Sequence, residues 1–339
     1  MKVTKLGRAF ASLAIFAATM TSSCMSPGDT ASAKIKAKCS KIGLTKVVNK
    51  ITFTCSKSGK NLIWSKSKIT STTTTSVQAT LEKFSFKYNL DSSLPSDFVA
   101  EFQTVMKNLG ELTPIESGSI SSNKSSMDVY SWKSTTGNPF QSQIGDITGS
   151  SISGNQNKRF MVLEIPALEF DQKLMHRYSV IPHEYFHVYQ LSLAKKDLGA
   201  GKWIIEGGAA TFESLYIQQY YGYNYFKDAQ TNVGLAAINN PQIFETYGSE
   251  EINYGSSVFL VLALVKELQK LNYSEQQAFR MVYLDFWIEF AKQSDWKIAF
   301  DKIFPVKLAD FYQSLLGYTN NINSVLPSES LRLQTIFSS

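Results

Sequence analysis

The residues best suited to chemistry are two histidines separated by three residues, with a glutamate directly after the first. They are His183, Glu184 and His187, which form the pattern HExxH. On a helix, residues four apart share a face and lie about 6 Å apart, so both imidazoles can bind one zinc ion while the glutamate faces its water. Pro182, directly before the first histidine, suits the first turn of such a helix. A surface helix with two unrelated histidines is the alternative, but all three histidines of the chain lie between His176 and His187, which favours a metal site.

A catalytic zinc ion needs a third protein ligand, because its fourth position is kept for water. No histidine follows His187. Metzincins carry Gly and His three and six residues after the second histidine, and this chain has Gln190 and Leu193 there, which excludes that class. His176 lies about 10.5 Å before His183 along a continuous helix, too far to bind the same ion. The third ligand is therefore expected to be a carboxylate.

Glu206 is the candidate for that carboxylate, nineteen positions after His187. A short loop over residues 195–201 would let a second helix return antiparallel to the first and place Glu206 across from the two histidines. The small residues 207–210 would allow the two helices to approach closely.

The spacing and its surroundings carry a family resemblance. HExxH followed after eighteen residues by Glu, within a WxxEGxA context at residues 203–209, resembles the gluzincin branch of zinc metallopeptidases, in particular peptidase MA-like families. The resemblance covers about residues 81–318 and is strongest over residues 176–213. It implies an α+β, zincin-like fold, in which a sheet-containing N-terminal lobe precedes a mainly helical C-terminal lobe and the zinc helix lies at their junction.

The same resemblance implies a role for each residue of the motif. His183, His187 and Glu206 would bind Zn²⁺, and Glu184 would be the general base. Zinc lowers the pKa of its bound water to about 7, so Glu184 can take a proton and later return it to the leaving amine. Glu213, two turns beyond Glu206, either supports a ligand histidine or forms an ordinary salt bridge.

An oxyanion-stabilising tyrosine is often present in related families. Tyr254 matches that context, and a core aromatic is the other interpretation of it. Tyr247, Tyr216 and His176 are alternatives for the same role.

Alternating and helical patterns predict the elements that must hold these residues. Strands are expected at Phe84–Tyr88, Met127–Trp132 and Arg159–Glu164, with a helix at Asp97–Leu109 and a mainly helical chain after Asp171. The strand at Arg159–Glu164 is either the edge strand that holds an extended peptide or an ordinary core strand. Residues 138–157, rich in Gly, Ser and Asn, are expected to form a long loop over the cleft.

The first 23 residues are expected to be a signal peptide. Lys2, Lys5 and Arg8 precede an apolar stretch, and the segment ends in a lipobox-like sequence before Cys24, where lipidation would anchor the protein. Thr21 replaces the usual leucine of a lipobox, so cleavage after Ala33 is the alternative. Either route predicts an extracytoplasmic protein, either a cell-surface lipoprotein or a secreted protein, that meets the membrane only through a lipid anchor. The apolar run at residues 257–265 is too short to span a bilayer.

A small module is expected at residues 31–68. Cys39 and Cys55 remain as a pair in an oxidising compartment, which predicts a disulfide across a β-hairpin formed by residues 47–55 and 61–66. Residues 31–70 contain ten Lys and no acidic residue, although the whole chain has a formal charge of only +6. This charge favours an anionic cell-envelope surface over nucleic acid as a partner, with a solvated spacer as the alternative. A Ser/Thr linker at 69–80 would separate the module from a zincin-like metallopeptidase domain at 81–339.

The sequence therefore predicts an exported zinc metallopeptidase acting on a peptide or protein substrate. The composition, 43% hydrophobic and 18% charged, excludes disordered and fibrous proteins. A catalytically silent zincin fold that serves as an envelope-binding or scaffold lipoprotein, and a hydrolase of non-peptide amides, are the alternatives.

Overall fold

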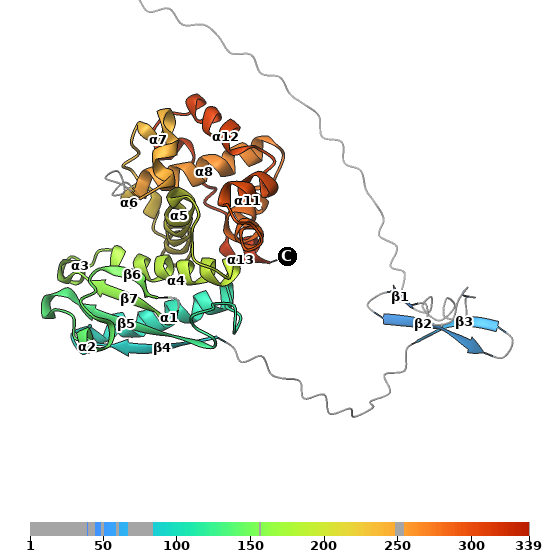
Figure 1. The fold of residues 1–339 in the computed structure, drawn as a ribbon, viewed down its shortest axis with the longest axis horizontal. Helices are drawn as coiled ribbons and strands as arrows, with labels where there is room; N and C mark the ends of the chain where they lie inside the picture. Colours follow the sequence, from blue (N-terminus) through green and yellow to red (C-terminus); the bar gives the residue numbers. More distant parts are fainter. Residues whose placement is uncertain are drawn as a thin grey trace, which may run out of the picture. The chain divides into compact units, whose positions relative to one another are not determined.

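The computed structural model describes residues 39, 45–48, 51–58, 61–66, 84–155, 157–247 and 254–338. The chain divides into two compact units, Met1–Gln78 and Ala79–Ser339 (Figure 1). The predicted signal peptide, Cys24 and the Ser/Thr linker lie outside the described residues.

The described part of the first unit is a three-stranded antiparallel sheet. Its strands are β1 (Thr45–Val48), β2 (Ile51–Ser58) and β3 (Asn61–Lys66), with β2 between the other two. The expected strand over 47–55 is wrong in part, because the chain reverses after Val48 and forms a second antiparallel pair. A disulfide joins Cys39 to Cys55 on β2.

The second unit combines one sheet with many helices, which confirms the mixed α+β class. The sheet contains β4 (Ser85–Leu90), β5 (Ser126–Lys133), β6 (Ser150–Gly154) and β7 (Arg159–Ile165), in the order β4-β5-β7-β6. β4, β5 and β7 are parallel, and β6 pairs with β7 in the antiparallel direction.

The edge of this sheet differs from the expectation. β7 lies between β5 and β6, so Arg159–Glu164 is a core strand, and the edge strand is β6. The interval 138–157 is also not one long loop, because it contains β6 and the short helix α2 (Gln141–Ile144). Ser and Gly have low strand propensity, so β6 owes its strand conformation to pairing with β7.

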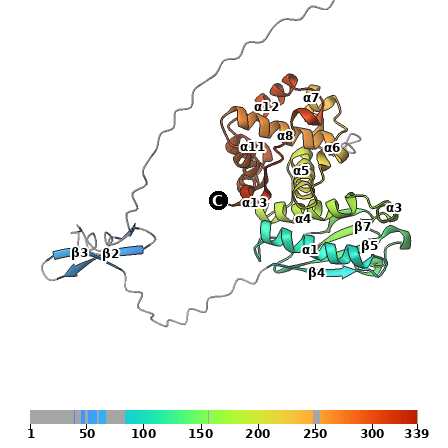
Figure 2. The ribbon, with the colours of Figure 1, turned by 180° about the vertical axis from the view of Figure 1, so that it is seen from behind.

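The two faces of the sheet have separate cores because side chains alternate along each strand. Val129 and Met161 point into the main core, together with α1 (Ser96–Leu112) and the helix α4 (His176–Ala194), which carries the HExxH motif. Tyr130 and Val162 point to the other face, where they pack with residues of the α2 segment. Figure 2 shows α1 across the sheet.

From His176 onward the described residues form helices and no strand, as expected. After the short helix α3 (Ala167–Asp171), the helices in order are α4, α5 (Lys202–Tyr221), α6 (Tyr225–Ala229), α7 (Ala236–Asn239), α8 (Tyr254–Lys270), α9 (Glu275–Arg280), α10 (Phe286–Phe290), α11 (Trp296–Ile303), α12 (Leu308–Ser314) and α13 (Leu333–Phe337). A π-helical turn at Met281–Asp285 joins α9 to α10. Within the described part of the chain, no helix is both long and apolar enough to cross a membrane.

Helix α4 begins earlier than Pro182 predicts. It starts at His176, so Pro182 lies inside the helix and supplies no N–H to the carbonyl one turn before it. The helix is nevertheless held on all sides, since residues 179–192 are all buried. The helix can therefore begin before Pro182, because tertiary packing stabilises the turn that precedes it.

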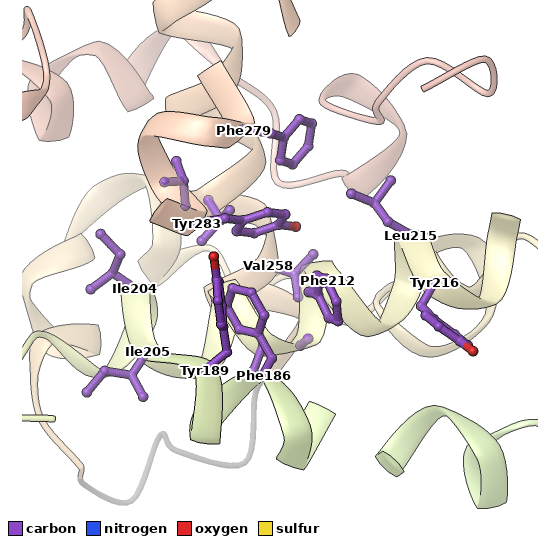
Figure 3. Packing of buried hydrophobic residues seen from close by; sticks show 14 of the residues in the cluster. Phe186, Tyr189, Ile204, Ile205, Phe212, Leu215, Tyr216, Val258, Phe279 and Tyr283 are labelled. Carbon is purple, nitrogen blue, oxygen red and sulfur yellow. The ribbon is translucent and has the colours of Figure 1, made fainter. Parts of the chain in front are cut away.

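Aromatic side chains fix the position of α4 against its helical neighbours. Phe186 stacks on Phe212 of α5 at 4.6 Å between ring centroids and meets Tyr283 of the π-helical turn edge-on at 5.0 Å. Figure 3 shows these rings together with Tyr189 and Phe279. This apolar packing leaves the face of α4 that carries His183 and His187 for polar contacts.

Candidate metal centre

The two histidines of HExxH project their rings to one point, one turn apart on α4. His183 Nε2 and His187 Nε2 are 3.2 Å apart, and both side chains are buried. Two ligands bound to one tetrahedral zinc at about 2.0–2.1 Å are separated by roughly 3.3 Å. The nitrogen pair therefore has the separation that a shared zinc ion requires.

Glu206 on α5 completes a triangle of ligand atoms. Its Oε2 lies 3.5 Å from His183 Nε2 and 3.3 Å from His187 Nε2. All three separations agree with one tetrahedral ion. Among the described residues these three form a group that could hold a metal ion.

Helix α5 presents Glu206 because it returns across α4 in the opposite direction. Ile205 contacts Gln190, Phe212 contacts Phe186, and Tyr221 stacks on Tyr178, so the contacts step backwards along α4. The chain reverses in the short loop between Ala194 and Lys202, where Lys195 adopts a left-handed conformation. The expected antiparallel return is confirmed.

The two glycines after Glu206 have different neighbours. A Cβ at Gly208 would meet Gln190 and Phe186 of α4 at ordinary contact distance, whereas a Cβ at Gly207 would collide with the backbone of Ser257 on α8. Gly207 therefore sets the close approach of α5 to α8, and Glu206 is held from both sides.

Each ligand histidine has a second partner on its other ring nitrogen. His183 Nδ1 lies 2.9 Å from Glu213 Oε2, and His187 Nδ1 lies 2.7 Å from Gln190 Oε1. Acceptors at Nδ1 place the proton there and leave Nε2 as the ligand atom. Glu213 has the supporting position that was one of its two expected roles. Gln190 has the same role but was considered only as evidence against metzincins.

Gln190 is itself fixed by a second hydrogen bond. Its Nε2 donates to the Ile205 carbonyl at 3.1 Å, next to Glu206, and its side chain is fully buried. Gln190 thus ties the orientation of His187 to the start of α5.

We expect Gln190→Met to weaken zinc binding by about 10- to 100-fold, because the variant keeps the side-chain volume but removes the acceptor that orients His187. Competition with a fluorescent zinc chelator measures this affinity. Gln190→Glu, which keeps an acceptor at the same place, should retain more of it. Equal affinities for Gln190→Met and the unmodified chain would contradict the orienting role.

Glu184 is buried on the same helix, and its Oε2 atom has no hydrogen-bond partner in the part of the chain that the structure describes. Burial raises the pKa of its carboxyl group above the ordinary value, although the two histidines act in the opposite direction. A carboxylate with a raised pKa is better matched to accept a proton near neutral pH. An unpartnered buried oxygen beside the ligand triangle also fits a group that acts on a water or substrate there.

The carboxylates of Glu206 and Glu213 place negative charge next to the two imidazoles. Burial lowers the pKa of His183, but Glu213 and Glu206 outweigh it and raise the pKa well above the ordinary value. The pKa of His187 is also raised, because Glu206 outweighs the opposing effect of burial. Although burial opposes the change, the histidines lower the pKa of Glu206. The carboxylates thus create a site that favours a cation.

Among the candidates for oxyanion stabilisation, Tyr254 and Tyr247 lie beside the three clustered residues His183, His187 and Glu206. The Tyr254 ring is 6.0 Å from the His183 ring, and Tyr247 donates its hydroxyl to Glu206 Oε1 at 2.7 Å. Tyr216 is elsewhere, where its hydroxyl accepts from Asn108. Since Tyr254 is 45% exposed, it is not the core aromatic that was the other interpretation.

His176, another candidate for oxyanion stabilisation, lies at the start of α4 and is paired with Glu169 at 2.7 Å.

The buried Lys202 has its ammonium within 6 Å of both tyrosine rings, at 5.6 Å from Tyr247 and 5.9 Å from Tyr254. Sequence reasoning missed Lys202, which lies one turn before Glu206. The spacing of four residues, which places Lys202 and Glu206 on one face of α5, was the signal that could have indicated it.

A cavity of about 470 Å³ opens onto the metal centre. His183, Glu184, His187 and Glu206 line it, together with Ser150–Ile152 of the edge strand β6. An unpaired strand edge offers backbone hydrogen bonds to an extended chain. The cavity thus brings a cation site, an unpartnered carboxylate and a strand edge into one cleft.

No protein-family model, curated protein or solved structure matches the chain significantly.

Proposed function

We propose that this protein is an exported zinc-dependent metallopeptidase that hydrolyses peptide bonds, with His183, His187 and Glu206 as zinc ligands and Glu184 as general base. The observation that carries the proposal is the ligand triangle, whose sides of 3.2–3.5 Å fit one tetrahedral ion. A set of two histidines and one carboxylate is the donor set of catalytic zinc sites that keep a position for water. The gluzincin, zincin-like assignment is part of the same proposal.

Bound zinc would supply Lewis acidity that polarises the scissile carbonyl and acidifies a water. Glu184 takes a proton from the attacking water and transfers it to the leaving amine. Its buried, unpartnered Oε2 and its raised pKa both support this role. Glu213 and Gln190 keep the two imidazoles in the ligand tautomer.

The substrate would lie along the edge strand β6. Ser150–Ile152 line the cleft beside the ligands, and β6 has β7 on one side only. An extended peptide that pairs with β6 would pass its backbone in front of Glu184. This placement replaces β7, which is enclosed, as the substrate-binding strand.

Tyr254 is the proposed donor to the oxyanion. We expect Tyr254→Phe to lower kcat by about 10- to 100-fold, because one hydrogen-bond donor is lost while zinc still stabilises the charge. Zinc content should stay the same, and the two are measured by steady-state kinetics and plasma mass spectrometry. Unchanged kcat would remove Tyr254 from the mechanism and favour Tyr247.

The direct test of the proposal is the metal content of the purified chain and its response to a chelator. We expect about one zinc per chain, loss of peptide hydrolysis when a chelator removes the zinc, and recovery when zinc is returned. A folded sample that binds no zinc after supplementation would refute the proposal.

The location and partners of the protein are proposed on the N-terminal sequence. A signal peptide at 1–23 with lipidation at Cys24, or cleavage after Ala33, would place the protein outside the cytoplasm. The Lys-rich module at 31–68, stapled by Cys39–Cys55, would contact anionic envelope material. Loss of this contact at high salt, in binding of residues 31–70 to purified envelope, would support an electrostatic interaction.

A further inference from the structure

A second cavity, of about 390 Å³, meets the metal centre. It shares Ser150, His183, Glu184 and Tyr254 with the first cavity, so both open onto the same point. A substrate held at the metal would therefore place one of its groups in this second space.

The charged side chains that line this second cavity are mainly carboxylates. Glu164, Glu184 and Glu213 line it, and no lysine or arginine does so among the described residues. His176 also lines it, but Glu169 neutralises its charge by pairing with Nδ1 at 2.7 Å. The other cavity differs, because Arg159 and Asp197 form an ion pair there.

Gln230 supplies an independent sign that a hydrogen-bond donor is missing. Its side chain is 3% exposed and lines the cavity, and its Oε1 atom has no hydrogen-bond partner among the described residues. Its Nε2 donates to Glu213 Oε1 at 3.4 Å, which fixes the amide so that the oxygen is the atom left over. A buried acceptor without a donor is costly, and a ligand with N–H groups would satisfy it.

Glu164 forms no ion pair with another of the described residues. Glu213 faces His183, and Glu184 would face the metal, whereas Glu164 Oε2 accepts the Gly149 N–H at 2.6 Å. The same backbone segment returns a bond, because the Glu164 N–H donates to the Gly149 carbonyl. Glu164 is thus held beside the start of the edge strand β6.

We propose that this cavity is a subsite for an ammonium or guanidinium group of the substrate, held by Glu164, Glu213 and Gln230. Pro166, Val180 and Ala210 also line the cavity and suit an aliphatic stem. A lysine or arginine side chain beside the scissile bond, or a free amino terminus, would supply the cation. This inference rests on the proposed metal centre and adds its substrate class.

Hydroxamates that anchor on zinc test the subsite without needing turnover. The probes are L-lysine hydroxamate and L-norleucine hydroxamate, whose side chains have the same four-carbon stem and differ by the terminal ammonium. Calorimetry on the zinc-loaded full chain should give about tenfold tighter binding of the lysine compound, because its ammonium makes charge-assisted hydrogen bonds. Forms of both probes that are acetylated on the α-amino group, and not on the lysine side chain, separate the two sources of the cation. A lysine preference that survives acetylation assigns the side chain, whereas affinity lost on acetylation of either probe assigns the amino terminus.

Variants connect the preference to these residues. Glu164→Gln and Gln230→Met should each reduce the lysine preference to about threefold or less, and Glu111→Gln, an exposed residue on α1, should keep it. Equal binding of all four probes by the unmodified chain would overturn the subsite and leave the metallopeptidase proposal standing. A preference that persists in both subsite variants would also overturn it. If no probe binds, the subsite and the metal centre fail together, whereas selective binding without any peptide hydrolysis would support the subsite and count against the peptidase.

Discussion

Glu184→Gln should lower peptide hydrolysis by about 10²- to 10⁴-fold while the protein keeps its zinc. The amide has nearly the same shape as the carboxyl group but cannot take a proton from water, which is the task assigned to a general base. Glu184 is not one of the three residues that could hold the metal ion, so the variant should still bind zinc. The measurement is kcat on a quenched fluorescent peptide, with zinc content by plasma mass spectrometry on the same preparation.

Glu111→Gln is the matched control for this variant, because it makes the same chemical change on the exposed surface of α1. It should leave both kcat and zinc content unchanged. Equal hydrolysis by Glu184→Gln and the unmodified chain would refute the mechanism. A zinc-loaded protein that hydrolyses no peptide even with Glu184 intact would favour the alternatives, a silent scaffold or a hydrolase of other amides, which a non-peptide amide library would distinguish.

Glu206→Gln should weaken zinc binding by roughly 10²- to 10³-fold. A zinc site of four ligands is worth about 10–16 kcal/mol, so one charged ligand accounts for about 3 to 4 kcal/mol. The variant also removes the negative charge that lies 3.3 Å from His187 Nε2 and 3.5 Å from His183 Nε2. Chelator competition measures the affinity, and circular dichroism shows whether the helices persist.

Glu213→Gln provides a graded comparison for this ligand. Glu213 contacts Nδ1 of His183, on the side of the ring opposite the proposed metal. Its loss should therefore weaken zinc binding by about 10-fold, which is within the range for residues that hydrogen-bond to a metal ligand. If Glu206→Gln retained the zinc affinity of the unmodified chain, the third ligand would have to be another group.

The sheet was predictable where burial imposes a pattern on the residues. The strand β5 alternates Val129 and Tyr130 between two separate cores, so its pattern is visible in the chain itself. The edge strand β6 was missed because its residues, Ser150–Gly154, are half-buried or exposed and carry no such alternation. Its conformation depends on β7, which a reading of local sequence does not include.

The cluster of His183, His187 and Glu206 was predictable for a different reason. His183 and His187 are fixed relative to one another by helix geometry alone, and Glu206 follows from a short reversal between two helices. The support for His187 was not predictable in this way. Gln190 is held against His187 because its amide also donates to the carbonyl of Ile205 on the next helix. Tyr247 reaches Glu206 from outside any long helix, so no periodic pattern pointed to it.

The contact of Gly207 with Ser257 makes the candidate metal site depend on a segment that comes much later in the chain. Glu206 lies on α5, which packs against α8, and Ser257 follows Gly207 by fifty residues. The HExxH motif and Glu206 therefore precede in the chain one of the helices that hold Glu206 in place. We expect a chain truncated before Tyr254 to keep the HExxH motif but to lose the proposed zinc site.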